Sequence, residues 1–254
     1  MIDLSGRVAL VTGSSRGIGR ACAIRLAEAG ADVIINYVTS HSAADEVARQ
    51  VAALGRRTAI VKADVSEQSD IIAMVSFVRD AFGALDILVS NAATGGFRPL
   101  LATTARQFEA AMNTNVRALV FLVQAALPLL EQRQGRARVI AISSHGSHLA
   151  LPMYGLIGST KAALESLIRH FAFELGKRGI NLNVVQAGLV ETDSTRAIPD
   201  HEALFARARA RTLARDCQVD AGDVADAVVY LSSDLSAMVQ GHVLVVDGGA
   251  SIHA

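Results

Sequence analysis

Short runs of β-branched and other apolar residues alternate along the chain with longer segments of helical period. Such runs predict strands buried on both faces, and each intervening segment is long enough to cross between parallel strands. The predicted strands are Val8–Val11, Val33–Asn36, Thr58–Val61, Ile87–Val89, Val139–Ile142, Leu182–Val185 and Val243–Val246. The predicted helices cover residues 17–29, 42–54, 67–82, 104–132, 155–177 and 221–233.

This alternation predicts an α/β fold: one doubly wound, parallel, seven-stranded sheet of the Rossmann type with helices on both faces. Proline, glycine or serine-rich linkers do not interrupt the 254 residues, so we expect a single domain over residues 1–254. The irregular stretch at about residues 187–216 predicts a lid over the substrate.

Composition and charge narrow the class of protein. Lysine plus arginine and aspartate plus glutamate number 24 each, which disfavours nucleic acid or a membrane surface as a partner. The most apolar stretch, Ala118–Leu130, is too short to span a bilayer, and Met1–Gly13 lacks the pattern of a signal peptide. Cys22 and Cys217 have neither disulfide-scaffold nor metal-ligand spacing. We therefore expect a cytoplasmic enzyme for a small molecule, without a metal.

A glycine-rich segment, Thr12–Gly19, follows the first predicted strand and opens the first predicted helix. Its glycines permit a tight turn and close backbone approach, and the helix N-terminus offers N–H groups to a pyrophosphate. The spacing Gly-x-x-x-Gly-x-Gly differs by one residue from the usual dinucleotide fingerprint. The residues predicted to contact a dinucleotide are Gly13, Ser15, Arg16, Gly17, Ile18 and Gly19.

The second predicted strand ends in Ile34-Ile35-Asn36-Tyr37. An NAD enzyme of this architecture usually carries an acidic residue there, for the adenosine ribose hydroxyls. Asn36 carries no negative charge, so it would not repel the 2′-phosphate of NADP(H). The planar guanidinium of Arg16 could bind that phosphate through paired hydrogen bonds. The sequence therefore predicts NADPH as the cofactor.

The order and spacing of these motifs resemble the short-chain dehydrogenase/reductase family along nearly the whole chain. The resemblance implies that Asp64 and Val65 contact the adenine and that Asn91 and Ala92 belong to an Asn-Ala-Gly element. It also implies a structural and catalytic role for Asn115. Further positions implied on the nicotinamide side are Gly188, in Gln186-Ala187-Gly188, and Thr192, while Asp247-Gly248-Gly249 closes the last strand.

The chain departs from that family at the catalytic tyrosine. Typical members have Tyr-x-x-x-Lys with a serine thirteen residues before the tyrosine; here Lys161 and Ser144 match, but Ile157 stands at the tyrosine position. Of the three tyrosines, Tyr154 alone lies in this region, seven residues before Lys161. Tyr-x6-Lys is the spacing of the family's enoyl-acyl-carrier-protein reductases, and the run Ser143–Ser147 is similar to enoyl reductase III.

The Tyr-x6-Lys spacing affects which oxygen of a substrate the phenol can reach. In ketone reduction the hydride reaches the carbonyl carbon, whereas in enoyl thioester reduction it reaches Cβ and charge develops on the thioester oxygen, two bonds further away. Seven helical residues span about 10 Å, which places Tyr154 on the same face as Lys161 but near the helix start. A phenol set back in this way matches the displaced oxygen.

We therefore expect NADPH-dependent reduction of the C=C bond of a 2-enoyl thioester carried by acyl carrier protein or coenzyme A. Tyr154 would donate to the enolate oxygen and Lys161 would hold the ribose, while the role of Ser144 stays open. One alternative is a short-chain carbonyl reductase or alcohol dehydrogenase acting on a 3-oxoacyl thioester or another ketone. Another is a dinucleotide-binding regulator that has lost catalysis.

Two further patterns concern partners. A basic cluster beside the predicted lid suits phosphate on coenzyme A or an acidic carrier protein, and a solvated helix face explains it equally well; its members are Arg207, Arg209, Arg211 and Arg215. The apolar helices near 104–132 and 155–177 suit burial against copies of the chain, and the family resemblance implies a homotetramer.

Overall fold

The structure is a computed structural model that describes residues 2–133, 135–196, 198, 200–214 and 219–253. Cys217, Arg215 and the end of the predicted lid at 215–216 lie outside the described residues. Cys22, in the first helix, is fully buried.

Seven parallel strands form one sheet in the order β3-β2-β1-β4-β5-β6-β7. The predicted strands are all present, and several extend by one to two residues at either end. Their bounds are β1 Val8–Val11, β2 Asp32–Tyr37, β3 Thr58–Lys62, β4 Ile87–Ser90, β5 Ala137–Ser144, β6 Ile180–Ala187 and β7 Val243–Val246. The predicted seven-stranded, doubly wound Rossmann-type sheet is confirmed.

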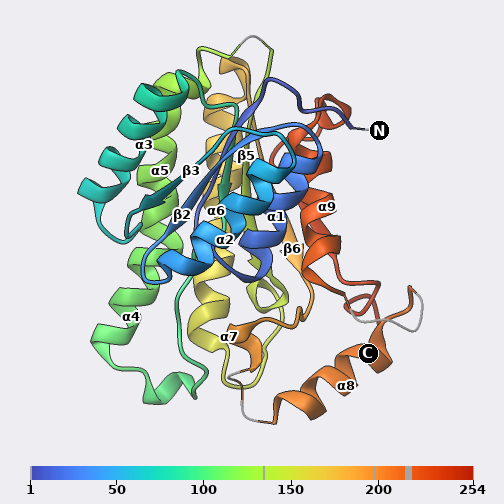
Figure 1. The fold of residues 1–254 in the computed structure, drawn as a ribbon. Helices are drawn as coiled ribbons and strands as arrows, with labels where there is room; N and C mark the ends of the chain where they lie inside the picture. Colours follow the sequence, from blue (N-terminus) through green and yellow to red (C-terminus); the bar gives the residue numbers. More distant parts are fainter. Residues whose placement is uncertain (1, 134, 197, 199, 215–218, 254) are drawn as a thin grey trace.

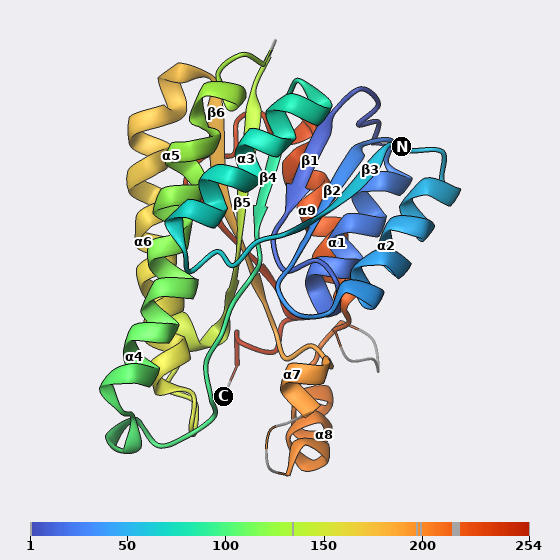
Figure 2. The same cartoon turned by 60° about the vertical axis from the view of Figure 1, so that its left-hand side comes forward.

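Helices cover both faces of this sheet (Figures 1 and 2). One face carries α1 Gly17–Glu28, α2 His41–Ala53 and α9 Ala221–Ser232. The other carries α3 Gln68–Phe82, α5 Ala118–Leu130 and α6 Gly155–Leu175. Two separate clusters of buried apolar side chains result, one on each side of the sheet. Aliphatic side chains fill both, as the low aromatic content of 4% requires.

The predicted helix at 104–132 is a continuous helical rod with a local change of winding. It begins at Thr104, whose hydroxyl forms a capping box with Gln107, and comprises α4 Ala105–Met112, a π-helical turn at Asn113–Arg117, and α5. The rod of 26 residues is long and apolar enough to cross a membrane by length and composition alone, which corrects the expectation drawn from Ala118–Leu130. In the fold, α5 packs its apolar side chains into the core.

The predicted irregular stretch at 187–216 contains two helices, α7 Asp193–Arg196 and α8 His201–Arg211, so the expectation of irregular structure there was wrong for these residues. Both helices lie beyond the carboxyl edge of the sheet (Figures 1 and 2). The expectation that this segment acts as a lid stays a prediction.

The strand order reverses between β1 and β4, which are neighbours in the sheet although two strands separate them in the chain. In such sheets the loops leaving the strands on either side of the reversal diverge and leave a crevice for ligands. The loops after β1 and β4 carry Thr12–Gly19 and Asn91–Ala93, so the fold brings the two predicted cofactor motifs together.

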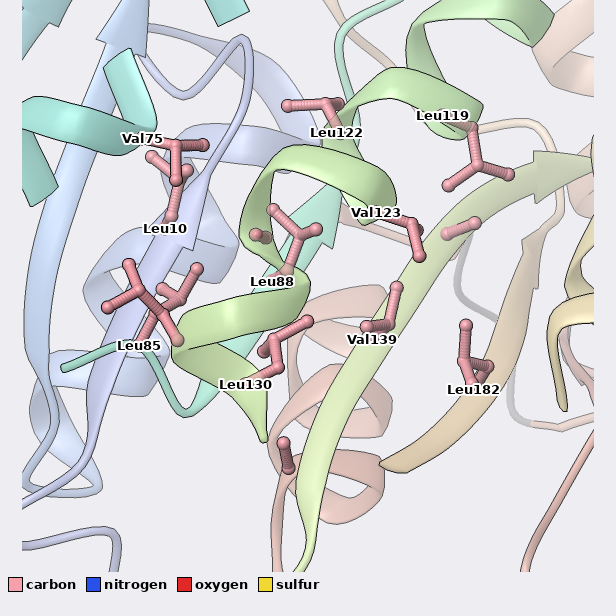
Figure 3. Packing of buried hydrophobic residues seen from close by; sticks show 14 of the residues in the cluster. Leu10, Val75, Leu85, Leu88, Leu119, Leu122, Val123, Leu130, Val139 and Leu182 are labelled. Atoms are coloured by element: carbon pink, nitrogen blue, oxygen red, sulfur yellow. The ribbon is translucent and has the colours of Figure 1, made fainter. Parts of the chain in front are cut away.

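We predict that shortening the buried core side chain Leu88 destabilises the protein far more than shortening an exposed leucine does. Leu88 on β4 is fully buried among Leu85, Leu130 and Val139 (Figure 3), so Leu88→Ala should reduce the free energy of unfolding by about 2–5 kcal/mol. Leu235→Ala, at a side chain that is 73% exposed, should cost less than about 0.5 kcal/mol. Urea denaturation measures both, and equal losses would contradict the assignment of this core.

Candidate active site

The glycine-rich loop depends on glycine for steric reasons at three positions. Gly13 and Gly17 have φ angles of 62° and 57°, in the left-handed region that side chains disfavour. A Cβ on Gly13 would lie 2.9 Å from the Cα of Ala92, and one on Gly19 would lie 2.4 Å from Nδ2 of Asn91. The loop therefore fits against the end of β4 only without side chains at these positions.

Two asparagines hold the loop in place. Asn91 donates from Nδ2 to the main-chain oxygens of Thr12 (2.9 Å) and Gly13 (3.1 Å). Asn36, at the end of β2, accepts from the Gly13 N–H (3.0 Å) and donates to the oxygen of Ala63 (2.9 Å). These bonds occupy the buried Asn36 carboxamide, so this residue holds the loop in place from the side of the sheet, and its contact with the cofactor stays a prediction.

Of the remaining loop residues, Arg16 and Ser15 are at least partly exposed to solvent and Ile18 packs against the core. Arg16 is exposed at the N-cap of α1, and it makes no ion pair among the residues that the structure describes. Ser15 is partly exposed, while Ile18 packs against the buried cluster behind α1. Of these three side chains, Arg16 is the one in a position to reach a phosphate outside the loop.

Asp64 and Val65, the residues predicted to contact the adenine of the cofactor, follow β3. Val65 is buried in the core, and Asp64 accepts hydrogen bonds at Oδ1 from the N–H (2.9 Å) and the hydroxyl (2.8 Å) of Ser66. The Asp64 side chain is partly exposed, so its carboxylate is accessible from solvent. The geometry thus orients a carboxylate beside the loop without burying it.

The predicted nicotinamide residues approach the loop from β6. Gly188 donates its N–H to the oxygen of Val246 (2.9 Å), and a Cβ at Gly188 would lie 3.1 Å from the Cβ of Asp247. The methyl group of Thr192 would lie 3.3 Å from a Cβ built on Gly17. The start of α1 therefore offers backbone N–H groups beside Thr192, an arrangement that fits a dinucleotide pyrophosphate.

Lys161 is buried on the inner face of α6. Its Nζ donates to the main-chain oxygen of Ile142 on β5 at 2.8 Å. Burial lowers the pKa of the Lys161 ammonium to about 8, although the negative charge of Glu165 opposes this shift. An ammonium whose pKa is this low changes charge within the range in which many enzymes work.

Tyr154 is clamped where α6 begins. Its ring stacks on Phe97 with centroids 5.9 Å apart, and a Cβ built on Gly146 would lie 2.3 Å from the ring atom Cδ1. The Ser144 side chain lies near the Tyr154 phenol. Burial raises the pKa of the Tyr154 phenol and the nearby Ser144 side chain opposes that rise, so the phenol is protonated and able to donate at neutral pH.

Ile157 occupies the position where ordinary family members have their tyrosine. Its side chain is buried, and a Cβ on Gly95 would lie 2.5 Å from its Cγ1. Ile157 therefore packs against the loop that follows β4 and supplies no polar group, so the structure leaves Tyr154 as the phenol near Ser144.

Asn115 lies in the π-helical turn, a type of irregularity that often marks functional sites. Its Nδ2 donates to the oxygen of Thr94 and to Oγ1 of Thr160, both at 2.9 Å, and its Oδ1 accepts from the Thr94 N–H at 2.8 Å. Asn115 thus ties the loop after β4 to α6 beside Lys161. This is the structural part of the role implied by the resemblance.

Comparison with known proteins identifies the family. A family model described as "Enoyl-(Acyl carrier protein) reductase" matches residues 13–251. The chain belongs to the short-chain dehydrogenase/reductase family. It is 35% identical to 1-cyclohexenylcarbonyl-CoA reductase of Streptomyces collinus, over 98% of this chain and 88% of that protein.

Solved structures agree with this assignment. A short-chain dehydrogenase from Burkholderia cenocepacia J2315 in complex with NADP is 36% identical, with a TM-score of 0.88 over 97% of this chain and 98% of that one. A gluconate 5-dehydrogenase from the same organism, in complex with NADP and tartrate, is 32% identical, with a TM-score of 0.92 over 100% and 98% of the two chains. This short-chain dehydrogenase/reductase is therefore an NAD(P)-dependent oxidoreductase.

Some polar groups of this short-chain dehydrogenase/reductase were not identified from the sequence. Glu165, one helical turn after Lys161, accepts hydrogen bonds from Ser143 Oγ (2.5 Å) and Gln186 Nε2 (3.1 Å). Nε2 of His145 lies 3.0 Å from Oδ2 of Asp247. Burial lowers the pKa of His145, with the Asp247 carboxylate acting in the opposite direction. The i, i+4 spacing from Lys161 was the signal that could have revealed Glu165.

The predicted basic cluster lies on α8, where Arg207 and Arg209 are exposed. Arg211 instead donates to the main-chain oxygens of Ala250 (3.0 Å) and His253 (2.5 Å). The N–H groups of residues 213 and 214 both bond the oxygen of Gly248. The end of α8 is therefore fastened to the segment that follows β7.

We predict that Arg16 is the residue of this short-chain dehydrogenase/reductase that distinguishes NADPH from NADH. Arg16→Ala should weaken NADPH binding about 10- to 100-fold, because a charge-assisted contact to the 2′-phosphate is lost, and should leave NADH binding unchanged. Arg20→Ala, at another exposed arginine one turn along α1, is the control and should affect neither. Fluorescence titration measures the four dissociation constants, and an equal loss for both nucleotides in Arg16→Ala would contradict this role.

Proposed function

We propose that this protein catalyses NADPH-dependent reduction of the C=C bond of a 2-enoyl thioester. The observation that carries the proposal is the position of Tyr154, at the start of α6, near Ser144 and seven residues before the buried Lys161. The relative named 1-cyclohexenylcarbonyl-CoA reductase and the enoyl reductase family model support this choice.

The chemistry requires a proton donor that is set back from the point of hydride transfer. NADPH, when bound, supplies the hydride. Tyr154 holds its proton ready for the oxygen on which charge develops, and the nearby Ser144 side chain would fix the direction of the phenol. The Lys161 ammonium holds the nicotinamide ribose and favours proton release from the phenol.

The preference for NADPH over NADH rests on charge. Asn36 replaces the acidic residue that NAD enzymes of this architecture use, and Arg16 offers an exposed guanidinium at the loop surface. The NADP bound to the Burkholderia cenocepacia relatives supports this preference.

An apolar rim suits the acyl part of the substrate. The segment before α6 and the loop after β4 lie side by side, since the Arg98 N–H donates to the oxygen of Met153 at 2.8 Å. Large apolar side chains are exposed along these two segments, namely Leu100, Leu101, Leu149, Leu151 and Met153. Exposed apolar side chains that gather next to a catalytic group favour a hydrocarbon ligand.

Carbonyl reduction is the second candidate function, and one observation favours it. Ser144 keeps the serine position of ordinary members of the family and lies near enough to the Tyr154 phenol to lower its pKa. The similarity to gluconate 5-dehydrogenase agrees with this reading. In this case Tyr154 would protonate the oxygen of the carbon that receives the hydride.

We also propose the acyl carrier, the lid, the compartment and the oligomeric state of the enzyme. The exposed Arg207 and Arg209 on α8 suit an acidic acyl carrier protein or the phosphates of coenzyme A as the carrier, and α7 and α8 would close over the substrate. Residues 1–254 would act as one domain, in a cytoplasmic homotetramer.

The deciding experiment compares crotonyl and acetoacetyl thioesters as substrates. The proposal predicts consumption of NADPH with the crotonyl thioester, and a loss of roughly 100-fold or more in kcat for Tyr154→Phe, because the phenol is the proton donor. Tyr230→Phe, on the distant α9, serves as the control and should behave as wild type. Turnover of the acetoacetyl thioester alone would overturn the proposal in favour of carbonyl reduction.

We predict that Gly146→Ala disables catalysis while sparing the cofactor site. The added methyl group would lie within the volume of the Tyr154 ring, and a displacement of about 1 Å in a reacting group costs about 100-fold in rate. NADPH binding, measured by fluorescence titration, should change by less than about twofold. Gly155→Ala is the matched control, because its Cβ would approach only the flexible Leu100 at 3.3 Å. Equal kcat values for the two variants would contradict the clamp around Tyr154.

A further inference from the structure

Glu165 projects from α6 on the same face as Lys161, one turn further along. Its Oε1 accepts the Ser143 hydroxyl at 2.5 Å and the Gln186 amide at 3.1 Å. Ser143 on β5 and Gln186 on β6 are cross-strand partners in the sheet, so one carboxylate oxygen bridges two neighbouring strand ends. A partly buried carboxylate with two donors is well ordered, since both bonds are charge-assisted.

Lys161 and Glu165 bind consecutive residues of the same strand. Lys161 donates to the oxygen of Ile142, and Glu165 accepts from the side chain of Ser143. The next residue is Ser144, whose side chain lies near the Tyr154 phenol. The two side chains of α6 therefore fasten the end of β5 immediately before the serine that orients the phenol.

The surroundings of Lys161 make Glu165 its counter-charge. Burial opposes the charged form of the lysine, and the attraction of Glu165 is the effect that acts against burial. Other titratable or charged groups lie on α6, on the strands, helices and turns packed against it and on residues 148–154; they are Arg106, Glu109, Arg117, Arg138, His145, His148, Tyr154, Arg169, His170, Glu174, Lys177 and Arg178. Of these, His148 contacts the same network, because its Nδ1 lies 3.3 Å from Nε2 of Gln186.

We propose that Glu165 is a positioning residue of the reductive site: it keeps the Lys161 ammonium charged for the cofactor ribose and fixes the end of β5 that carries Ser144. This inference rests on the proposed role of Lys161 at the cofactor. It does not depend on whether a C=C or a C=O bond is reduced.

The effect of the Glu165 charge on Lys161 is tested with Glu165→Gln, which keeps the shape of the side chain and an oxygen that accepts from Ser143. NADPH dissociation constants are measured by fluorescence titration from pH 7 upwards. In the wild type, binding should weaken as the pH rises through about 8, where the ammonium loses its proton. In Glu165→Gln the loss should begin roughly one pH unit lower, because the stabilising negative charge is absent.

Glu174→Gln is the matched control, since Glu174 is exposed on the same helix and makes no hydrogen bond or ion pair with the site among the described residues. Its pH profile should superimpose on that of the wild type. Superposition of the Glu165→Gln profile as well would overturn the proposal, as would a loss of NADPH affinity that is equal at every pH. Failure of the proposed function would look different, since enoyl turnover would be absent while the pH shift in binding persisted.

The role of Glu165 in fixing the end of β5 is tested with Ser143→Ala, which removes the hydroxyl and leaves the charge of Glu165 in place. The proposal predicts a kcat several-fold lower and an unchanged pH midpoint for NADPH binding, because Ser144 and Tyr154 lose alignment while Lys161 keeps its counter-charge. Thermal melting by circular dichroism identifies any variant that fails to fold. A shift of the midpoint in folded Ser143→Ala, or an unchanged kcat, would contradict this division of roles.

Discussion

The close approach of the glycine loop to the ends of β1, β2 and β4 is the constraint on which the site depends. At Gly13 and Gly19 a single methyl group would collide with main-chain or side-chain atoms of the loop after β4. Asn36 and Asn91 then fix the loop through hydrogen bonds to its backbone. The N–H groups at the start of α1 consequently point into the crevice at the strand reversal, where a pyrophosphate can use them.

Everything on the catalytic side is arranged around α6. Its first turn carries Tyr154, its second Lys161 and its third Glu165, and each bonds or stacks with a group from β5 or the loop after β4. Ile157 fills the ordinary tyrosine position with an apolar side chain. Tyr154 thus stands seven residues before Lys161, where a ketone reductase of this family has four, and this spacing is the basis for proposing that the phenol serves a more distant oxygen.

Much of this architecture could be predicted from the sequence, because buried parallel strands and crossover helices leave strong periodic patterns. The helix α8 was missed because its pattern is weakly amphipathic, with Phe205 as its buried residue. Asn36 was assigned by position alone, whereas its hydrogen bonds show that it faces the loop. The stacking of Phe97 on Tyr154 joins residues far apart in the chain, and no spacing rule relates them. Glu165, by contrast, was accessible through helical spacing.

The central claim, that hydride reaches Cβ of an enoyl thioester while Tyr154 serves the distant oxygen, is tested most directly by isotope placement. Crotonyl thioester is reduced with NADPH that carries deuterium at the transferable position of C4, and the product is examined by NMR. The account predicts deuterium at the β-carbon and a solvent proton at the α-carbon. Crotonyl thioester without deuterium, while the same NADPH places deuterium on the carbinol carbon formed from acetoacetyl thioester, would contradict it.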